Sequence, residues 1–277
     1  MREWTVPNSR GTIIIVHGLG EHSGRYRQVA AALNADGWSV IGYDQVGHGM
    51  GGGKRGAIPS RKALLDKLAA VVDGAPTRRV ILLGHSMGGV VAARFVAGNI
   101  RPVDALILSS PALDPGLKRM EQMAVRVLDR LAPNFQTRNG LDTSKVSHDP
   151  EVVRNYKSDP LNHDQVTPRL VKFIMDEGLY VRKRAAQWRV PTLLMWAGDD
   201  HLVAPGGSAE FAAKAPRDVV TAREWPGLYH EIFNEMEPAR GQVIATMIAW
   251  LDALPAPVRT LPEGLEALPV SAPAEVE

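Results

Sequence analysis

One strand–turn–helix signature, at residues 79–94, constrains this chain more than any other feature. An apolar run from Val80 to Leu83 leads into Gly84-His-Ser-Met-Gly88, and a small apolar segment, Val90 to Ala93, follows. A Gly-x-Ser-x-Gly turn between a buried strand and a helix holds its serine in a strained conformation, and the glycines leave room for it. The N-terminus of the next helix would stabilise a developing oxyanion. The pattern predicts Ser86 as a nucleophile; the alternative is a glycine-rich turn with an idle serine.

Strands and helices alternate through the first part of the chain. We expect strands at residues 12–16, 38–43, 80–83 and 104–108, and helices at residues 26–33, at residues 62–72 and after Ser86. The predicted strands are apolar throughout, which is typical of a parallel sheet covered by helices on both faces. The sequence therefore predicts the α/β class.

The alternation breaks between residues 113 and 188. This segment shows no convincing buried strand, and its apolar residues have helical spacing at residues 116–131, 152–156 and 168–179. Strand patterns return at residues 191–196 and 219–225, before a closing helix at residues 241–254. We expect core parts at 1–112 and 189–254, with 113–188 as a helical cap over the carboxyl edge of the sheet, where ligands bind. Residues 255–277 hold five prolines and are expected to form a disordered tail.

Composition excludes several classes of protein. The chain has 277 residues, 45% of them hydrophobic, which suffices for a large core. Its 32 basic and 30 acidic residues argue against a nucleic-acid-binding protein, and the absence of cysteine rules out disulfides and thiol nucleophiles. The first residues, Met1 to Pro7, lack the apolar core of a signal peptide, and no apolar run approaches the roughly 18 residues of a membrane span. We therefore expect a cytoplasmic protein, with its oligomeric state left open.

A nucleophilic serine needs a base, and the base needs an orienting carboxylate. Two predicted strand ends offer candidates: Asp199-Asp200-His201 follows one strand, and His230 follows the next. The chain order Ser86, acid, histidine is the one that this fold requires, and it favours His230 over His201 as the base. From the residues alone, Asp199 and Asp200 both remain candidates for the acid.

The first predicted strand ends at Gly18-Leu19-Gly20, which allows two interpretations. The turn is similar to a dinucleotide-binding turn, and Asp44 would be its ribose-binding acid. However, the third glycine is replaced by Ser23, and a dinucleotide site would not explain the serine turn. The other interpretation is an oxyanion hole made by the backbone N–H groups of Leu19 and Met87.

Four further histidines need an assignment. His17, His22 and His48 lie in loops at predicted strand ends, but no ligand spacing supports a metal site made from them. We therefore expect no metal and no other cofactor. His85, beside the nucleophile, either lines the pocket or packs in the core.

Four segments carry a resemblance to a known family. They are His17-Gly-Leu-Gly-Glu-His-Ser-Gly-Arg-Tyr26, Gly84-His-Ser-Met-Gly-Gly89, Tyr156-Lys-Ser-Asp-Pro-Leu161 and Tyr229-His230. In this order they resemble the monoacylglycerol lipase and lysophospholipase group of α/β-hydrolases, over about residues 12–254. The resemblance implies an α/β-hydrolase fold, with a mostly parallel central sheet, helices on both faces and a helical cap.

The same resemblance implies roles for particular residues. It makes Ser86 the nucleophile, His230 the base and Asp200 the orienting acid. It also implies that Leu19 and Met87 form the oxyanion hole. The polar head of the substrate would lie near the residues that match the family's head-group contacts, Arg25, His85 and Tyr156.

The expected function is a serine hydrolase that cleaves carboxylic esters through an acyl-enzyme. Monoacylglycerols or similar single-chain lipids are the expected substrates. Lysophospholipase and carboxylesterase are the other activities expected within this class. One alternative is a peptidase or perhydrolase on the same fold, although the peptidase group usually has tryptophan where this chain has Met87. Another alternative is a binding protein that keeps the fold without catalysis.

The predicted cap helix at residues 116–131 is amphipathic. We expect its apolar stripe to pack the cap on the body or, in part, to line an acyl channel suited to flexible methionines. The stripe consists of Met120, Met123, Val127 and Leu131. Its basic residues would form either a solvated face or a transient contact with an anionic lipid surface. These are Lys118, Arg119, Arg126 and Arg130.

Overall fold

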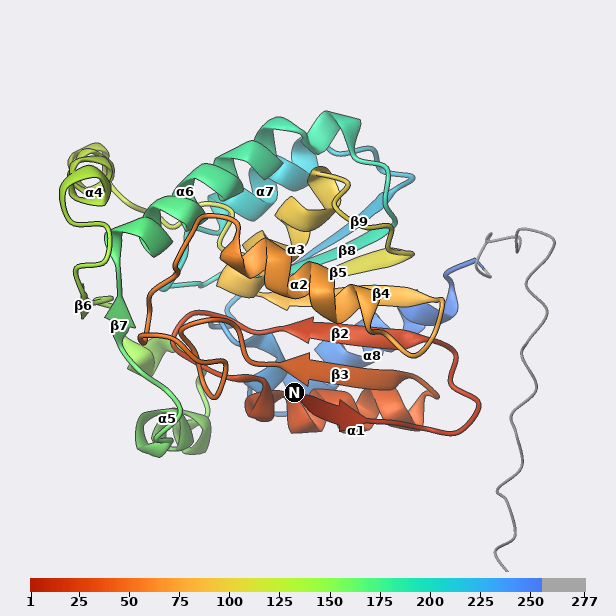
Figure 1. Cartoon of the computed structure of the whole chain (residues 1–277). Coiled ribbons are helices and arrows are strands. Elements are labelled where there is room, and N and C mark those ends of the chain that lie inside the picture. Colours follow the sequence, from red (N-terminus) through yellow and green to blue (C-terminus); the bar gives the residue numbers. More distant parts are fainter. Residues whose placement is uncertain (256–277) are drawn as a thin grey trace, which may run out of the picture.

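The computed structural model describes residues 1–255 and contains one large sheet with helices on both faces (Figure 1). The elements in chain order are β1 (Arg2–Trp4), β2 (Thr12–Val16), η1 (Ser23–Tyr26), α1 (Arg27–Ala35), β3 (Ser39–Tyr43), α2 (Ala63–Asp73), β4 (Val80–His85), α3 (Met87–Ala97), β5 (Ala105–Ser109), α4 (Arg119–Leu131), β6 (Thr137–Arg138), η2 (Thr143–Lys145), α5 (Pro150–Ser158), β7 (Gln165–Val166), α6 (Pro168–Lys183), η3 (Ala185–Gln187), β8 (Thr192–Ala197), α7 (Gly206–Lys214), β9 (Val220–Trp225), η4 (Ile232–Asn234) and α8 (Ala239–Asp252).

The strand order in the sheet is β1-β3-β2-β4-β5-β8-β9. All neighbouring strands run parallel except β1, which pairs antiparallel with β3. Strands β2, β3, β4, β5 and β8 are buried along their whole length, whereas the edge strand β9 exposes its four central residues. The uniformly apolar strands predicted from the sequence are therefore the interior strands of an α/β sheet.

Successive residues of β2 point to opposite faces of the sheet. Ile14 and Val16 pack with α2, α3, α6 and α7, whereas Ile13 and Ile15 pack with α1 and α8. Figure 1 shows these two helical layers above and below the strands. The predicted α/β-hydrolase architecture is confirmed at this level.

The segment between β5 and β8 contains the three predicted helices, which are α4, α5 and α6. In Figure 1, α4, β6, α5 and β7 lie beyond the carboxyl ends of the parallel strands, whereas α6 extends along the body beside α3. The segment also contains an unpredicted antiparallel pair, β6 with β7, of two residues each. The division into core and cap stays a prediction, and nearly all of the predicted tail lies outside the described residues.

Two elements of the main body were not predicted. Strand β1 has only three residues, too few to show a period, and it forms by pairing Arg2 with Gly42 and Trp4 with Val40. Helix α7 begins with Gly-Gly-Ser, a poor helix-forming sequence, and buries Phe211 against the sheet. None of the helices within residues 1–255 combines the length and the apolar character needed to cross a bilayer.

The apolar stripe of α4 does not pack on the body, so that expectation was wrong. Met120 is 82% exposed and Leu131 is 78% exposed, while Met123 and Val127 also face solvent. Helix α4 contacts α6 and partly buries a different face, which includes Val125 and Asp129. Spacing identified an amphipathic helix, but the packing partner selected the other face.

Candidate active site

Ser86 lies at the sharp turn between β4 and α3. Its backbone dihedrals are φ 53° and ψ −121°, a strained conformation for a residue with a side chain. A Cβ added to Gly88 would lie 2.0 Å from the carbonyl oxygen of Val16, and one added to Gly84 would lie 2.7 Å from the oxygen of Gly88. Both flanking positions therefore require glycine, and the turn has the geometry of a nucleophile elbow.

His230 and Asp200 form a buried pair at the carboxyl edge of the sheet. The Nδ1 atom of His230 lies 2.6 Å from Oδ2 of Asp200, and their side chains are only 5% and 1% exposed. The other oxygen of Asp200 accepts hydrogen bonds from the backbone N–H groups of Leu202 at 2.8 Å and Val203 at 3.1 Å. The carboxylate is thus held by its own loop and aimed at the imidazole.

Asp199, the other candidate acid, lies in a different environment. Its side chain is exposed, and its nearest basic partner is His201 at 3.2 Å. The geometry therefore favours Asp200 over Asp199 as the partner of His230.

The charges around His230 suit a general base. Burial, the largest single influence, would lower the pKa of His230, but the charge and hydrogen bond of Asp200 together with the charges of Glu231 and Glu21 outweigh it, so that the pKa is raised. Burial would raise the pKa of Asp200, but His230 and the two loop N–H groups lower it. Asp200 therefore stays ionised at neutral pH and stabilises the protonated form of the imidazole.

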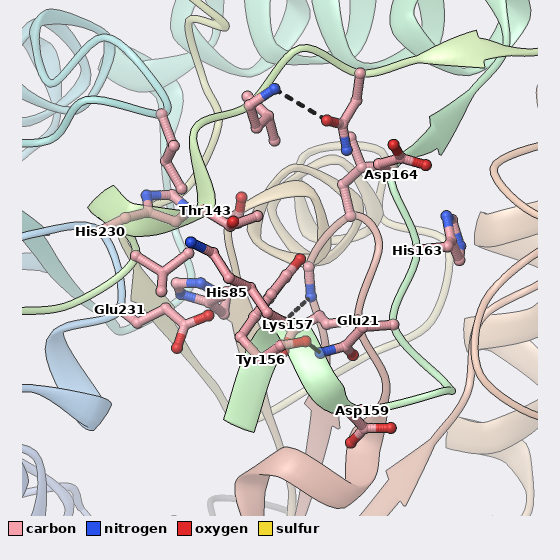
Figure 2. A pocket seen from close by; sticks show the side chains of 18 residues that line it. Glu21, His85, Thr143, Tyr156, Lys157, Asp159, His163, Asp164, His230 and Glu231 are labelled. Carbon is pink, nitrogen blue, oxygen red and sulfur yellow. Dashed lines mark hydrogen bonds between the residues drawn. The ribbon is translucent and has the colours of Figure 1, made fainter. Parts of the chain in front are cut away.

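Ser86 and His230 line the same cavity, which has a volume of about 260 Å³. In the described part of the chain no hydrogen bond joins the Ser86 hydroxyl to His230, and catalytic hydrogen bonds of this kind often tighten only in the transition state. Figure 2 shows Glu21, His85, His230 and Glu231 around this cavity. Its aliphatic lining is limited to Leu19, Leu141, Val146 and Leu202.

The predicted oxyanion loop runs beside the nucleophile. A Cβ added to Gly18 would lie 3.2 Å from the Cβ of Ser86, and Leu19 lines the cavity. Met87 is the first residue of α3, where a backbone N–H has no partner within the helix. Leu19 therefore lies at the cavity, and Met87 directly follows the nucleophile in the chain.

His17 fixes the peptide that carries the Leu19 N–H. The backbone N–H of Gln45 donates to His17 Nε2 at 2.9 Å, so the ring proton is on Nδ1, which donates to the Gly18 carbonyl at 2.8 Å. In a trans peptide the carbonyl of Gly18 and the N–H of Leu19 point in opposite directions. Burial lowers the pKa of His17, which keeps this neutral form at neutral pH.

The residues of the dinucleotide and metal alternatives make other contacts. Asp44 accepts hydrogen bonds from the N–H groups of Ser23 and Met50, both at 2.9 Å, so it serves its own loop. The two ring nitrogens of His22 bond the Gly24 N–H and Asp159. Among residues 1–255, no group of three or more potential ligands could hold a metal ion.

Of the three predicted head-group residues, His85 and Tyr156 line the cavity and Arg25 does not. The Arg25 guanidinium lies over the Tyr156 ring, 4.6 Å from its centroid, and bonds Glu21 and Glu231. Burial and the nearby His230 lower the pKa of His85 to about 4, so its ring is neutral.

The residue types alone did not single out several residues of the cavity. Glu21 and Glu231 lie within or directly beside the motifs at residues 17–26 and 229–230, which was an available signal. The remaining polar residues come from the segment between β5 and β8, for which the sequence predicted helices but not how they are arranged around the cavity. They include Asn139, Thr143, Lys157, Asn162 and Asp164.

Comparison with known proteins agrees with this geometry. A family model described as serine aminopeptidase, S33, matches residues 7–237. A monoacylglycerol lipase of Mycolicibacterium smegmatis is 34% identical over 256 residues, which cover 90% of each chain. The phospholipase YtpA of Bacillus subtilis is 33% identical over 91% of this chain and 99% of its own length.

A solved structure leads to the same family. The crystal structure of Paleococcus ferrophilus monoacylglycerol lipase superposes with a TM-score of 0.84 at 31% identity, over 90% of this chain and 96% of that one. With the elbow and the buried histidine–aspartate pair at the carboxyl edge of a mostly parallel sheet, this chain belongs to the serine aminopeptidase S33 family of α/β-hydrolases.

Proposed function

We propose that this protein is a serine hydrolase that cleaves the carboxylic ester bond of monoacylglycerols or similar single-chain lipids. One observation carries the proposal: Ser86, at a strained elbow, lines the same cavity as His230, which is bonded to the buried Asp200. The relatives named monoacylglycerol lipase and phospholipase support the same class of substrate.

In the proposed mechanism, Ser86 attacks the ester carbonyl while His230 takes its proton. Asp200 holds the imidazole in the required tautomer and stabilises its charge. The N–H groups of Leu19 and Met87 bind the oxyanion of the tetrahedral intermediate. His230 then gives the proton to the leaving alcohol, and the acyl group stays on Ser86 until a water, activated by His230, releases the acid.

The cavity lining supports a polar, hydroxyl-rich leaving group. Polar residues outnumber aliphatic ones among the residues that line it, and carboxylates and uncharged polar groups can bond the hydroxyls of a glycerol-like head. The carboxylates are Glu21, Asp159, Asp164 and Glu231, and the uncharged polar groups include Asn139, Thr143, Tyr156 and Asn162.

The proposal is tested by hydrolysis of p-nitrophenyl and glycerol monoesters with acyl chains from two to sixteen carbons. We expect activity on glycerol esters that rises to medium or long chains, and a loss of about 10⁴- to 10⁶-fold in turnover in Ser86→Ala. A variant that keeps most of its ester hydrolysis would refute the role of Ser86. Activity confined to the shortest chains would replace the lipid assignment by a general esterase.

The alternatives are tested in the same assays. Amide substrates presented beside esters of the same acyl group distinguish a peptidase, an alternative that the family description keeps relevant. Peroxide in place of water as the acceptor distinguishes a perhydrolase. If the protein does not react with a fluorophosphonate, the result would support the alternative of a non-catalytic binding protein. The expected cytoplasmic location stays a prediction.

We also propose a transient contact between α4 and an anionic lipid surface. The outward stripe of the helix exposes Met120, Met123, Val127 and Leu131. Exposed basic residues surround it, and apolar side chains flanked by basic ones suit an anionic interface. These are Lys118, Arg119, Arg126 and Arg130.

Sedimentation with phosphatidylglycerol vesicles tests this contact. We expect binding that weakens in salt and in the double variant Met123→Ser/Leu131→Ser. The control is Met50→Ser, which removes a methionine that is 77% exposed on the loop after β3. Equal binding by the α4 variant and the control would contradict the proposal.

A further inference from the structure

Three charged side chains link the two loops that flank the nucleophile. Glu21 belongs to the loop that follows β2, and Glu231 directly follows His230 in the chain. Arg25 donates one hydrogen bond to Glu21 at 2.6 Å and two to Glu231, at 2.6 and 2.7 Å. Both carboxylates are buried, and the Arg25 side chain is 11% exposed.

The Glu21 end of this link holds the oxyanion loop. Its Oε1 accepts the backbone N–H of Gly18 at 2.6 Å and the hydroxyl of Tyr26 at 2.7 Å. The loop residue Gly18 is thus fixed at its N–H by Glu21, in addition to the bond that its carbonyl makes with His17. A shift of Glu21 would therefore turn the peptide that carries the Leu19 N–H.

The Glu231 end of the link holds the loop that carries His230. The carboxylate of Glu231 also accepts from Asn234 at 2.9 Å, and its backbone N–H donates to the Val146 carbonyl at 2.8 Å. Because Glu231 and His230 are neighbours, the position of the imidazole depends on these bonds.

We propose that Arg25 is a positioning residue: held between Glu21 and Glu231, it couples the oxyanion loop to the loop that carries His230. This inference rests on the proposed ester hydrolysis at Ser86. Arg25 then acts without touching the substrate, in place of the head-group contact expected from the resemblance. A bidentate guanidinium suits this role because its planar fork bonds both oxygens of one carboxylate and still reaches a second.

The link also carries a net charge. Two carboxylates and one guanidinium sum to −1, and the excess negative charge lies near His230. The pKa of the His230 imidazole depends on all the titratable groups that face it. These are Asp200, His85, Glu21 and Glu231. Removal of one carboxylate should therefore lower the pKa of His230, and the acidic limb of kcat/KM should move to lower pH.

The test uses the isosteric variants Glu21→Gln and Glu231→Gln and their combination, assayed on one monoester. We expect each single variant to lower kcat about 10-fold or more, up to the roughly 10²- to 10³-fold cost of a fully lost oxyanion donor, with KM changed less than about three-fold. The two substitutions break the same link, so the double variant should lose much less than the product of the single losses. Multiplicative losses would overturn the coupling.

A trifluoromethyl ketone gives a second readout, because it forms a hemiketal oxyanion on a serine. Its inhibition constant should rise in parallel with the loss in kcat, whereas a purely structural effect would leave the two unrelated. The matched control is Glu177→Gln, which removes the partner of Arg94 at 2.5 Å, away from the cavity. It should leave kcat, inhibition and the pH profile unchanged.

Two further variants complete the test. If a glutamine variant does not fold, Arg25→Lys tests the same link, because an ammonium keeps the charge but lacks the planar fork. Wild-type kcat, inhibition and pH profile in the folded variants would overturn the inference. Ser86→Ala separates the two levels: if it stays active, the proposed function itself fails, whatever the glutamate variants do.

Discussion

The substitution Asp200→Asn should invert the hydrogen bond that orients His230. In the structure, Oδ1 of Asp200 accepts two backbone N–H groups of its own loop, and Oδ2 faces Nδ1 of His230 at 2.6 Å. An asparagine has one oxygen, and the two loop N–H groups retain it. Its NH₂ group must then face Nδ1, which becomes an acceptor, so the ring proton moves to Nε2. In that tautomer His230 cannot take the proton of Ser86.

The size of the effect follows from this wrong tautomer and from the lost charge. Loss of the correctly oriented base at an otherwise intact triad lowers kcat by about 10⁴-fold, or roughly 5.5 kcal/mol of transition-state stabilisation. The fold should survive, because the side chain keeps its size and its two loop hydrogen bonds. KM should stay within a few-fold, since Asp200 does not line the cavity.

The assay is steady-state hydrolysis of p-nitrophenyl butyrate, with thermal unfolding to confirm the fold. The matched control is Asp199→Asn, which changes the neighbouring, exposed carboxylate. We expect the control to keep kcat within about two-fold of the wild type, as surface changes do. The reasoning would be refuted if the folded Asp200 variant kept more than a tenth of its activity, or if the Asp199 variant lost as much.

Three further predictions concern pH and packing. Since the base must be neutral and the pKa of His230 is raised above its ordinary 6.5, kcat/KM should be half-maximal on the acidic side at a pH above 6.5; a half-point below that value would contradict the electrostatics. The variant Gly88→Ala places a Cβ 2.0 Å from the Val16 oxygen and should cost about 3 kcal/mol or more, seen as a Tm drop on the order of 6–12 °C. Its control, Gly206→Ala, meets open space and should leave Tm within about 2 °C; equal shifts would count against the steric explanation. The buried carboxylate of Glu235 accepts hydrogen bonds from three backbone N–H groups, so Glu235→Ala should lower the free energy of unfolding by about 3 kcal/mol. A urea unfolding curve unchanged from the wild type would refute this.

The sheet, and the grouping of Ser86, Asp200 and His230 at its carboxyl edge, were predictable because their signals are local. A buried parallel strand is apolar on both faces, so residues 12–16 and 80–83 stood out without tertiary information. The strained serine requires glycines at fixed spacing, and that requirement is visible in the sequence. The fold then fixes the order of acid and base, which limited the choice to two adjacent aspartates.

Features that depend on tertiary packing were not predictable from local pattern. The period of α4 showed an apolar stripe, but only the contact with α6 decided that Val125, and not Met120 or Leu131, would face the protein. Arg25 was expected near the polar head of the substrate because the family resemblance implied that contact. In the structure it bonds Glu21 and also Glu231, which is 206 residues away in the chain.

The short strand β1 and helix α7 were missed for a related reason. Their sequences are weak in isolation, and they form because neighbouring elements offer partners. Strand β1 pairs with the otherwise open edge of β3, and α7 packs Phe211 into the core. Tertiary context outweighs intrinsic propensity in both cases.

The most direct measurement of the central claim is the mass of the protein after reaction with a fluorophosphonate, followed by peptide mapping. A nucleophile activated as proposed should take one adduct per chain, on the peptide that contains Ser86, with the loss of ester hydrolysis in proportion to labelling. The Ser86→Ala variant should remain unlabelled. Ester hydrolysis that persists after full labelling, or an adduct on another residue, would contradict the assignment of Ser86 as the nucleophile.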